Sequence, residues 1–487
     1  MKIVENVKKI GLKELSNLVF TSPKARHLLL PKVDKKIKAA FAEMTNRPYE
    51  VPAEVEGQYW FIRNLLMRAS ERMDENLISP DIMKTMFNTF VDNVLFKGVT
   101  IKDKAYSEEG IENPTLLVIS PTMRCNLHCT GCYAGSDKET AASLDWDTFD
   151  RILTEKEKLW DSYFTTISGG EPFMWRDGDR TIYDMFAKHK NQYFMVYTNG
   201  TFLNEENVRK LSDAGNVAPA ISVEGFKEET DGRRGDGVYD KVLEAFENLR
   251  NAGVPFGISV TPTRKNAELL LSDKFVDFYF GEQKAIFGWA FQYMPVGRDI
   301  DFDIMVTPEQ RLNMYRRSKH ILEEKGYSYI DFWNNGYLSN GCIAGGRKGG
   351  FLYINWDGNV APCVFVPYYT ANIYDIYKNG GDLNTVRNCK LFRDIRDWQK
   401  SYGYMQHRDK VGNRLMPCPI RDHHSEMLNI LRKNNVKPLD PYAEEALKSD
   451  RYHEHLIEYD KKLARVFDPV WKEDFVNYKN SWQGNSR

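Results

Sequence analysis

The stretch Leu116-Leu-Val-Ile-Ser-Pro-Thr-Met-Arg-Cys125-Asn-Leu-His-Cys129-Thr-Gly-Cys132 decides the fold. It begins with a short apolar run, Leu116–Ser120, which predicts a buried strand. Three cysteines follow in a C-x3-C-x2-C spacing. A buried strand that leads directly into a cysteine-rich loop places three reactive thiols at one end of a sheet, so these cysteines are the first candidates for a functional site.

The cysteine count favours a metal site. The chain has seven cysteines in 487 residues, and an odd number argues against a framework of disulfides. Three thiolates on one short loop can bind three irons of a 4Fe–4S cube, because cysteine thiolate is the usual ligand of such clusters, and the fourth iron then stays open for a small molecule. The alternative is a structural zinc loop with His128 as fourth ligand. It is less favoured because His128 lies between the cysteines rather than at a usual offset.

A second motif, Ser168-Gly-Gly-Glu-Pro172, follows the apolar run Phe164–Ile167. Glycines let a ligand approach the backbone closely, and a carboxylate forms a charge-assisted hydrogen bond with an ammonium group. Together with the cysteine spacing, this motif makes the chain resemble the radical S-adenosylmethionine (radical SAM) superfamily over roughly residues 113–425. The resemblance implies that Gly169, Gly170 and Glu171 bind the methionine amino group of S-adenosylmethionine.

Apolar runs alternate with amphipathic stretches through the middle of the chain. The runs are Leu116–Ser120, Phe164–Ile167, Tyr193–Tyr197, Ala218–Val223, Phe256–Thr261 and Trp289–Tyr293. The amphipathic stretches are Trp146–Trp160, Thr181–His189, Asn204–Ala214 and Tyr239–Asn251. This alternation predicts an α/β fold with a parallel sheet. The resemblance implies a partial (βα)6 TIM-like barrel, in which ligands gather at the carboxyl ends of the strands.

Polar residues mark the expected ends of the later strands. The segments are Thr198-Asn-Gly200, Ser222-Val-Glu-Gly225 and Asp231-Gly-Arg-Arg-Gly235. The family usually has Asp where this chain has Glu224, which leaves its reach to the ribose hydroxyls open. Arg233 and Arg234 are alternative partners for the cofactor carboxylate, and Arg234 is favoured because it directly precedes the glycine. The resemblance thus implies four further cofactor contacts: Asn199, Ser222, Glu224 and Arg234.

The last third of the chain holds the other four cysteines, Cys342, Cys363, Cys389 and Cys418. Tyr353–Val360 contains an Asp-Gly dipeptide and predicts a β-hairpin. This region resembles the auxiliary-cluster extension called SPASM, or its shorter form, twitch. Four thiolates are the ligand count of one 4Fe–4S cluster. Two alternatives stay open: a zinc ion held by the same thiolates, and a site in which Cys389 is only a buried thiol and His423 or a substrate group takes the fourth place.

The two ends of the chain match no motif. Residues 1–48 hold eleven Lys or Arg and four Asp or Glu, and a basic amphipathic helix near the start can lie on an anionic membrane surface or simply pack on the barrel. We expect four regions: helices over residues 1–112, the barrel over 113–305, an auxiliary iron–sulfur domain over 306–425, and a helical tail over 426–487. The helices expected in the first region are Lys13–Leu18, Lys35–Glu43, Val55–Met73 and Asp81–Leu95.

The formal net charge is −1, so the composition does not favour a nucleic-acid partner. The chain shows neither a secretory signal nor an apolar run long enough to span a membrane, so we expect a cytoplasmic enzyme, with peripheral contact at the inner face of the membrane through the basic N-terminus as a further option. A non-catalytic iron–sulfur electron carrier and a zinc-organised nucleic-acid binder are less favoured.

The resemblance implies two 4Fe–4S clusters, S-adenosylmethionine and an electron donor of the flavodoxin or ferredoxin type. It also implies an oxidoreductase or carbon–carbon bond-forming enzyme that makes a 5′-deoxyadenosyl radical and takes hydrogen from an unactivated C–H bond. The basic N-terminus and the aromatic content favour a hydrophobic substrate such as a lipid. The auxiliary domain favours the alternative, a ribosomally made peptide or protein.

Overall fold

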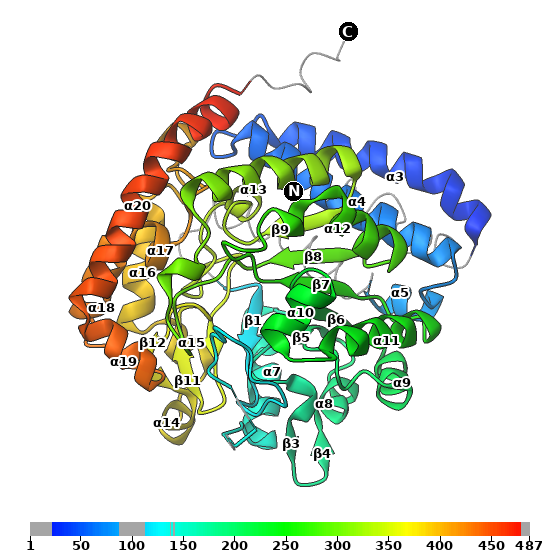
Figure 1. The fold of residues 1–487 in the computed structure, drawn as a ribbon, viewed down its shortest axis with the longest axis horizontal. Helices are drawn as coiled ribbons and strands as arrows, with labels where there is room; N and C mark the ends of the chain where they lie inside the picture. Colours follow the sequence, from blue (N-terminus) through cyan, green and yellow to red (C-terminus); the bar gives the residue numbers. More distant parts are fainter. Residues whose placement is uncertain (1–21, 87–112, 137, 140–141, 479–487) are drawn as a thin grey trace.

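The computed structural model of the protein describes residues 22–86, 113–136, 138–139 and 142–478 (Figure 1). A large mixed sheet runs through the middle of these residues, in the strand order β13-β11-β10-β1-β2-β5-β6-β7-β8-β9. The six predicted strands are adjacent and parallel in this sheet. They are β1 (Leu116–Ile119), β2 (Phe164–Ile167), β5 (Tyr193–Thr198), β6 (Val217–Val223), β7 (Gly257–Val260) and β8 (Phe287–Ala290). The predicted α/β fold with a partial parallel barrel is therefore confirmed.

The sheet is wider than predicted. The strand β9 (Ser328–Asp331) pairs in parallel with β8, and β10 (Tyr353–Ile354) pairs in parallel with β1. Both strands come from the region expected to form the auxiliary domain, so that region continues the barrel sheet on both sides. The strand β8 also begins and ends earlier than the predicted Trp289–Tyr293, because the chain leaves the sheet after Ala290.

Helices cover the outer face of the parallel strands (Figure 1). They are α7 (Trp146–Trp160), α8 (Ile182–Lys188), α9 (Glu205–Ala214), α10 (Lys227–Arg234), α11 (Val238–Asn251) and α12 (Asp273–Val276). Side chains of Asp145 and Asn204 accept backbone N–H groups at the starts of α7 and α9, which satisfies donors that a helix leaves free. The amphipathic predictions for α7, α8, α9 and α11 are correct to within two residues at each end, whereas α10 was not predicted as a helix.

The N-terminal helices are α3 (Pro23–Met44), α4 (Pro52–Asp74) and α5 (Pro80–Met86). Helix α4 packs against β9 and the short π-helix η6 (Ile321–Lys325), where Asn64 Nδ2 donates to the carbonyl of Leu322 at 2.7 Å. The predicted basic amphipathic helix, Lys13–Leu18 included, lies outside the described residues, as do residues 87–95 of the predicted Asp81–Leu95. In the part of the chain that the structure describes, every helix is too short or too polar to cross a lipid bilayer.

The C-terminal third wraps one side of the barrel (Figure 1). The predicted hairpin is present: β10 pairs antiparallel with β11 (Asn359–Ala361), and Gly358 at the turn has a φ of +75°. Short strands also occur at β3 (Arg176–Asp177), β4 (Arg180–Thr181), β12 (Tyr368–Tyr369), β13 (Ala371–Asn372) and β14 (Lys437–Pro438). The helices are α13 (Pro308–His320), α14 (Ile373–Lys378), α15 (Leu383–Arg387), α16 (Lys390–Ser401), α17 (Pro419–Asp422), α18 (His424–Lys433), α19 (Pro441–Lys448) and α20 (Asp450–Trp471).

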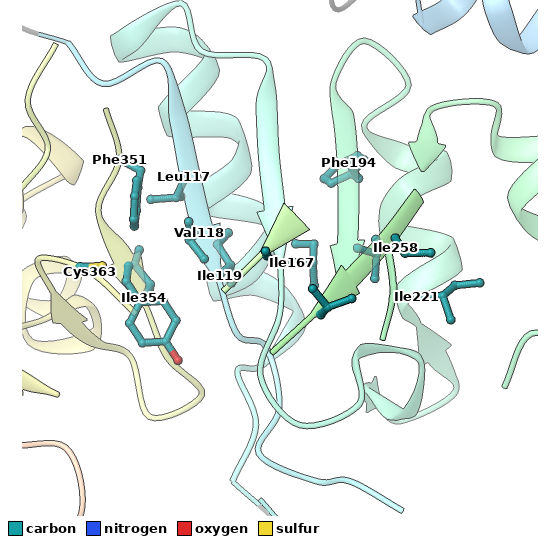
Figure 2. Close-up of a cluster of buried hydrophobic side chains, with 14 of the residues drawn as sticks. Leu117, Val118, Ile119, Ile167, Phe194, Ile221, Ile258, Phe351, Ile354 and Cys363 are labelled. Atoms are coloured by element: carbon teal, nitrogen blue, oxygen red, sulfur yellow. The ribbon is translucent and has the colours of Figure 1, made fainter. Parts of the chain in front are cut away.

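The main hydrophobic core joins the barrel to this C-terminal region. Leu117 and Ile119 on β1 and Ile167 on β2 are fully buried, and Ile119 lies between Ile167 and its other partner, Ile354 on β10 (Figure 2). Cys363 belongs to the same cluster and is 8% exposed. Because one continuous core spans both regions, the segment that carries Cys363 is held rigidly against the first strand of the barrel.

A fully buried ion pair connects α13 to α17. Arg311 donates to both carboxylate oxygens of Asp422, at 2.6 and 3.0 Å, and neither side chain is exposed. Burial alone would raise the pKa of the Asp422 carboxyl, but Arg311 and Arg421 hold that pKa well below its usual range. Asp422 Oδ2 also accepts the backbone N–H of Cys418 at 3.2 Å. The pair therefore positions the segment that carries one of the four later cysteines.

Replacing Arg311 by Met should lower the free energy of unfolding by about 3–5 kcal/mol, because it leaves the Asp422 carboxylate buried without its main partner. Urea unfolding of the two proteins measures this difference. The folded-state pKa of Asp422 lies below its unfolded value, so the stabilisation is present above roughly pH 4 and is lost as the pH falls below it. Arg316→Met, at an exposed position of the same helix, is the matched control. Equal losses in both variants would contradict the prediction.

Candidate functional site

The loop after β1 brings the first three cysteines to one cavity. Cys125, Cys129 and Cys132 are all half-buried, and all three line a cavity of about 280 Å³ at the carboxyl ends of the barrel strands. Burial raises the pKa of Cys125 to about 12, with smaller contributions from the nearby Glu171, Cys129 and Cys132. Burial also raises the pKa of Cys129, which Arg234 opposes. A positively charged iron group at this point would reverse these shifts, because thiolates are its ligands.

Two N–H groups already point at the Cys125 sulfur. The backbone of Leu127 donates to it at 3.5 Å, and Asn199 Nδ2 approaches it at 3.9 Å while also donating to Asn126 Oδ1 at 2.9 Å. Donors of this kind stabilise thiolate ligands and tune iron–sulfur centres. The donor set therefore fits a cluster with three cysteine ligands. In the described residues, no three His, Cys, Asp or Glu side chains converge tightly enough to hold a single metal ion. The identity of the metal stays a prediction.

The two glycines after β2 are required by the cysteine loop itself. Gly169 has a φ of +118°, and a Cβ atom there would lie 2.7 Å from the carbonyl oxygen of Thr122. A Cβ atom on Gly170 would lie 2.2 Å from the carbonyl oxygen of Arg124. The backbone of Gly170 also donates to Thr122 at 3.0 Å. The glycines therefore let the two loops contact directly, a reason that the sequence prediction did not include. Both glycines also line the cavity.

Glu171 is a link between loops in this structure. Its carboxylate accepts hydrogen bonds from Thr198 Oγ1 and from the Asn199 backbone, each at 2.8 Å, and from the Phe173 backbone at 3.2 Å. The side chain is fully buried and does not line the cavity, unlike the two glycines before it. Burial raises the pKa of Glu171 to about 7. Contact between the Glu171 carboxylate and the cofactor amino group stays a prediction. The structure itself shows that Glu171 is hydrogen-bonded to the end of β5.

Replacing Glu171 by Ala should weaken S-adenosylmethionine binding by about tenfold or more. The change leaves buried donors unsatisfied, each at a cost of about 1–3 kcal/mol, and releases Asn199 beside Cys125. Calorimetry on the anaerobically reconstituted enzyme measures the affinity. Glu206→Ala, at an exposed position on α9, is the control. An affinity equal to that of the control would count against a role for Glu171 at this site.

The predicted carboxylate-binding arginines both contact Glu224. Arg233 and Arg234 each donate to Glu224 Oε1 at 2.5 Å, and the backbone of Thr261 donates to Oε2 at 3.2 Å. Glu224 is 1% exposed, whereas both arginines line the cavity. Both arginines share the same carboxylate, so their contacts do not separate the two alternatives. Ser222 lines the cavity as well. The cavity is thus lined by five of the predicted cofactor contacts, Gly169, Gly170, Asn199, Ser222 and Arg234, but not by Glu171 or Glu224.

The other side of the cavity is apolar. Side chains from the inner face of the strands form it together with residues of the C-terminal region, and they include Met195, Tyr197, Trp289, Phe291, Phe332 and Phe365. Among the described residues that line the cavity, only Arg233 and Arg234 carry a charge. This apolar wall could not be predicted directly from the sequence, because its residues lie on separate strands and each alone is typical of a barrel core.

Three of the four later cysteines lie behind this wall. Burial raises the pKa of Cys363 well above its usual value, and the thiols that raise it further are Cys342 and Cys418. The neighbours of two of these cysteines in the chain, Ile343 and Val364, line the cavity. The three thiols are therefore grouped directly behind the apolar side of the cavity.

Cys389 has different surroundings. It precedes α16, and its thiol accepts a hydrogen bond from Thr370 Oγ1 at 3.6 Å. His423, the alternative fourth ligand, bonds to the carbonyl of Met416 at 2.8 Å and packs against Tyr402. These contacts favour a site with three thiols, but both the four-cysteine site and the His423 site stay predictions.

Several known proteins are similar to this chain over much of its length. Residues 119–272 match the model of the Radical SAM superfamily. The mycofactocin maturase MftC of Mycolicibacterium smegmatis is 28% identical over 306 residues, which cover 60% of this chain and 75% of that protein. An AdoMet-dependent heme synthase of Methanosarcina barkeri is 26% identical over 318 residues, covering 60% of this chain and 87% of that protein.

Among solved structures, Streptococcus suis SuiB bound to the precursor peptide SuiA superposes with a TM-score of 0.49 at 17% identity, covering 62% of this chain and 70% of that one. On the family match and the curated relatives, the chain is a radical SAM enzyme.

Proposed function

We propose that this radical SAM enzyme modifies a peptide or protein by removing hydrogen from an unactivated C–H bond. The observation that carries the proposal is the cavity, in which the three-cysteine loop faces an apolar wall and a second group of cysteines lies behind that wall. A reactive radical needs a site that limits access of water and charged competitors, and a cavity with a largely apolar wall contributes to this.

The chain's own residues have distinct roles in this proposal. Cys125, Cys129 and Cys132 hold a 4Fe–4S cluster, which when bound supplies the electron that cleaves S-adenosylmethionine to a 5′-deoxyadenosyl radical. The backbone of Gly169 and Gly170 receives the methionine amino group, with Glu171 fixing that loop. The ribose and carboxylate contacts fall to Asn199, Ser222, Glu224 and Arg234.

A second 4Fe–4S cluster is held by Cys342, Cys363 and Cys418, with Cys389 or another group as fourth ligand. When bound, it can accept or supply one electron as the substrate radical resolves. A flavodoxin- or ferredoxin-type protein supplies the reducing electron. We also propose the division of the chain into four regions, with boundaries at residues 112, 305 and 425. Strands of the barrel region and of the auxiliary region belong to one continuous sheet, so these two regions form one structural unit.

The comparisons favour a peptide over the lipid that the sequence first suggested. The relative MftC is named as a maturase, that is, an enzyme that processes a precursor. The structure of SuiB was solved with a bound precursor peptide. The identity to MftC extends over 60% of this chain, so it covers more than the radical SAM region alone.

A second candidate, an acyl or other hydrocarbon chain, is supported by one observation. The described residues on the far side of the cavity carry no charge and are mostly aromatic or aliphatic. Burying a methylene group in such a space stabilises binding by about 0.8 kcal/mol. The membrane contact expected to accompany this reading depends on residues 1–21, outside the described part of the chain.

The test is deuterium transfer. The enzyme is reconstituted anaerobically, reduced with dithionite and supplied with S-adenosylmethionine and either a peptide extract or a lipid extract in deuterated form. Deuterium in 5′-deoxyadenosine from the peptide extract alone supports the peptide proposal. Deuterium from the lipid extract alone would overturn it in favour of the second candidate.

A further inference from the structure

Gln292 is a polar residue in the apolar part of the cavity wall. It follows β8 by two residues, is 1% exposed and lines the cavity. Its neighbour Phe291 packs against Phe332 and Phe365, with ring centroids 5.3 and 6.0 Å apart. Its other neighbour, Tyr293, packs against Gly131 of the cysteine loop. Gln292 therefore lies between the cysteine loop and the aromatic wall, where the reacting part of a substrate must lie.

Two buried charged groups fix the orientation of the Gln292 amide. Its Oε1 accepts from Arg421 Nη1 at 3.0 Å, and its Nε2 donates to Asp331 Oδ2 at 2.8 Å. A guanidinium can only donate, so the oxygen must face Arg421 and the NH2 group must face Asp331. The positions of oxygen and nitrogen thus follow from the chemistry of the partners.

The two partners are themselves held in place. Asp331 Oδ1 accepts the backbone N–H groups of Trp333 and Asn334, at 2.9 and 2.8 Å. Arg421 donates to Asp422 at 3.1 Å, and its guanidinium lies 4.4 Å from the centre of the Trp333 ring. Each partner of Gln292 is thus held by at least one further buried contact, although Arg421 Nη2 itself has no hydrogen-bond partner, so the Gln292 amide is held in one orientation.

An amide has two N–H donors and an oxygen with two lone pairs. After its contacts with Arg421 and Asp331, Gln292 keeps one N–H and one oxygen lone pair. These two groups complement one extended residue of a peptide, whose C=O would accept from Nε2 and whose N–H would donate to Oε1, because the C=O and N–H of such a residue point to the same side. A hydrocarbon offers no partner for either group.

We propose that Gln292 binds an amide of the substrate backbone and thereby positions the adjacent side chain in the aromatic part of the cavity. The proposal rests on the proposed peptide function and narrows it: the bound residue carries an uncharged, apolar or aromatic side chain. Sites built to hydrogen-bond a polar group discriminate strongly against analogues that lack it, because the buried groups of the site are then left unpaired.

The experiment measures binding to the reconstituted enzyme with S-adenosylmethionine present. The probes are N-acetyl-L-phenylalanine N-methylamide, which has a backbone amide on each side, and n-butylbenzene, which has none. We expect Gln292→Met to weaken binding of the amide probe by about tenfold. Binding of the hydrocarbon probe should stay unchanged or become tighter. Gln283→Met, outside the cavity, is the control and should change neither probe. Formation of 5′-deoxyadenosine without substrate should stay near the wild-type rate in Gln283→Met.

Three outcomes would overturn the proposal. They are equal affinity of the amide probe in Gln292→Met and wild type, an equal loss for both probes, and tighter binding of n-butylbenzene than of the amide probe to the wild type. If Gln292→Met fails to fold or to bind iron, Gln292→Glu takes its place. This substitution keeps the side-chain length and the contact with Arg421 but removes the N–H donors. Binding of the amide probe should therefore weaken again, while binding of n-butylbenzene should not.

The proposed function can fail independently of this inference. If the amide probe depends on Gln292 but no peptide exchanges deuterium with 5′-deoxyadenosine, the amide preference stands and the peptide assignment falls. If peptides exchange deuterium equally well with Gln292→Met and with the wild type, the peptide assignment stands and the role of Gln292 falls.

Discussion

Replacing Cys125, Cys129 and Cys132 together by alanine should abolish the formation of 5′-deoxyadenosine from S-adenosylmethionine. The three thiols occupy one loop, all line the same cavity, and each pair is close enough for a charge on one to raise the pKa of another. Without them no thiolate remains in that loop to hold iron next to the predicted cofactor contacts. Product formation in the dithionite-reduced enzyme, measured by chromatography, should fall to the background seen without enzyme.

The triple variant should also keep about half of the iron, or roughly four irons per chain, because the later cysteines are untouched. Iron analysis and the visible absorption of the reconstituted protein measure this. Retained cleavage of S-adenosylmethionine would show that the cluster lies elsewhere. Zinc in place of iron, with no cleavage in the wild type either, would support the structural zinc loop that the sequence left open.

The barrel could be predicted because its signals are local. In runs such as Phe164–Ile167 and Tyr193–Thr198 all residues but one are buried, as expected for parallel strands covered on both faces, and amphipathic helices separate these runs. The strand β9 was missed because Ser328–Asp331 is short and has polar residues at both ends. Helix α10 was missed because it has few apolar residues and contains a glycine.

The site was predictable only in part, for a similar reason. The cysteine and glycine motifs are each contiguous in the sequence, so their residue types and spacing can be read directly. The contacts of Gln292 with Arg421 and of Arg311 with Asp422 join residues 129 and 111 positions apart. Pairs so distant leave no periodicity or spacing in a single sequence. The role of Glu171 as a link to Asn199 likewise appears only once β2 and β5 are adjacent.

Replacing Cys418 by Ala should remove about four irons from the reconstituted enzyme, whereas replacing Cys389 by Ala should remove none. Cys342 and Cys418 are the thiols whose charges raise the pKa of Cys363. The backbone N–H of Cys418 donates to Asp422, which holds that cysteine in place. Cys389 instead contacts the hydroxyl of Thr370. The two variants are matched controls for each other, because each changes one half-buried thiol of the same region. Iron analysis and the electron paramagnetic resonance signal of the reduced protein measure the loss.

The two results decide what the second cluster does. Three protein thiolates leave one iron open, so a heteroatom of the substrate or another side chain can bind there, and the cluster would help to place the substrate behind the apolar wall. Four thiolates close the cluster, which then acts only by transferring an electron. Loss of about four irons on replacing Cys389 would therefore establish the closed site that the cysteine count first suggested. Full retention, with loss on replacing Cys418, would assign the site to Cys342, Cys363 and Cys418 and make the open iron the next position to search for a substrate ligand.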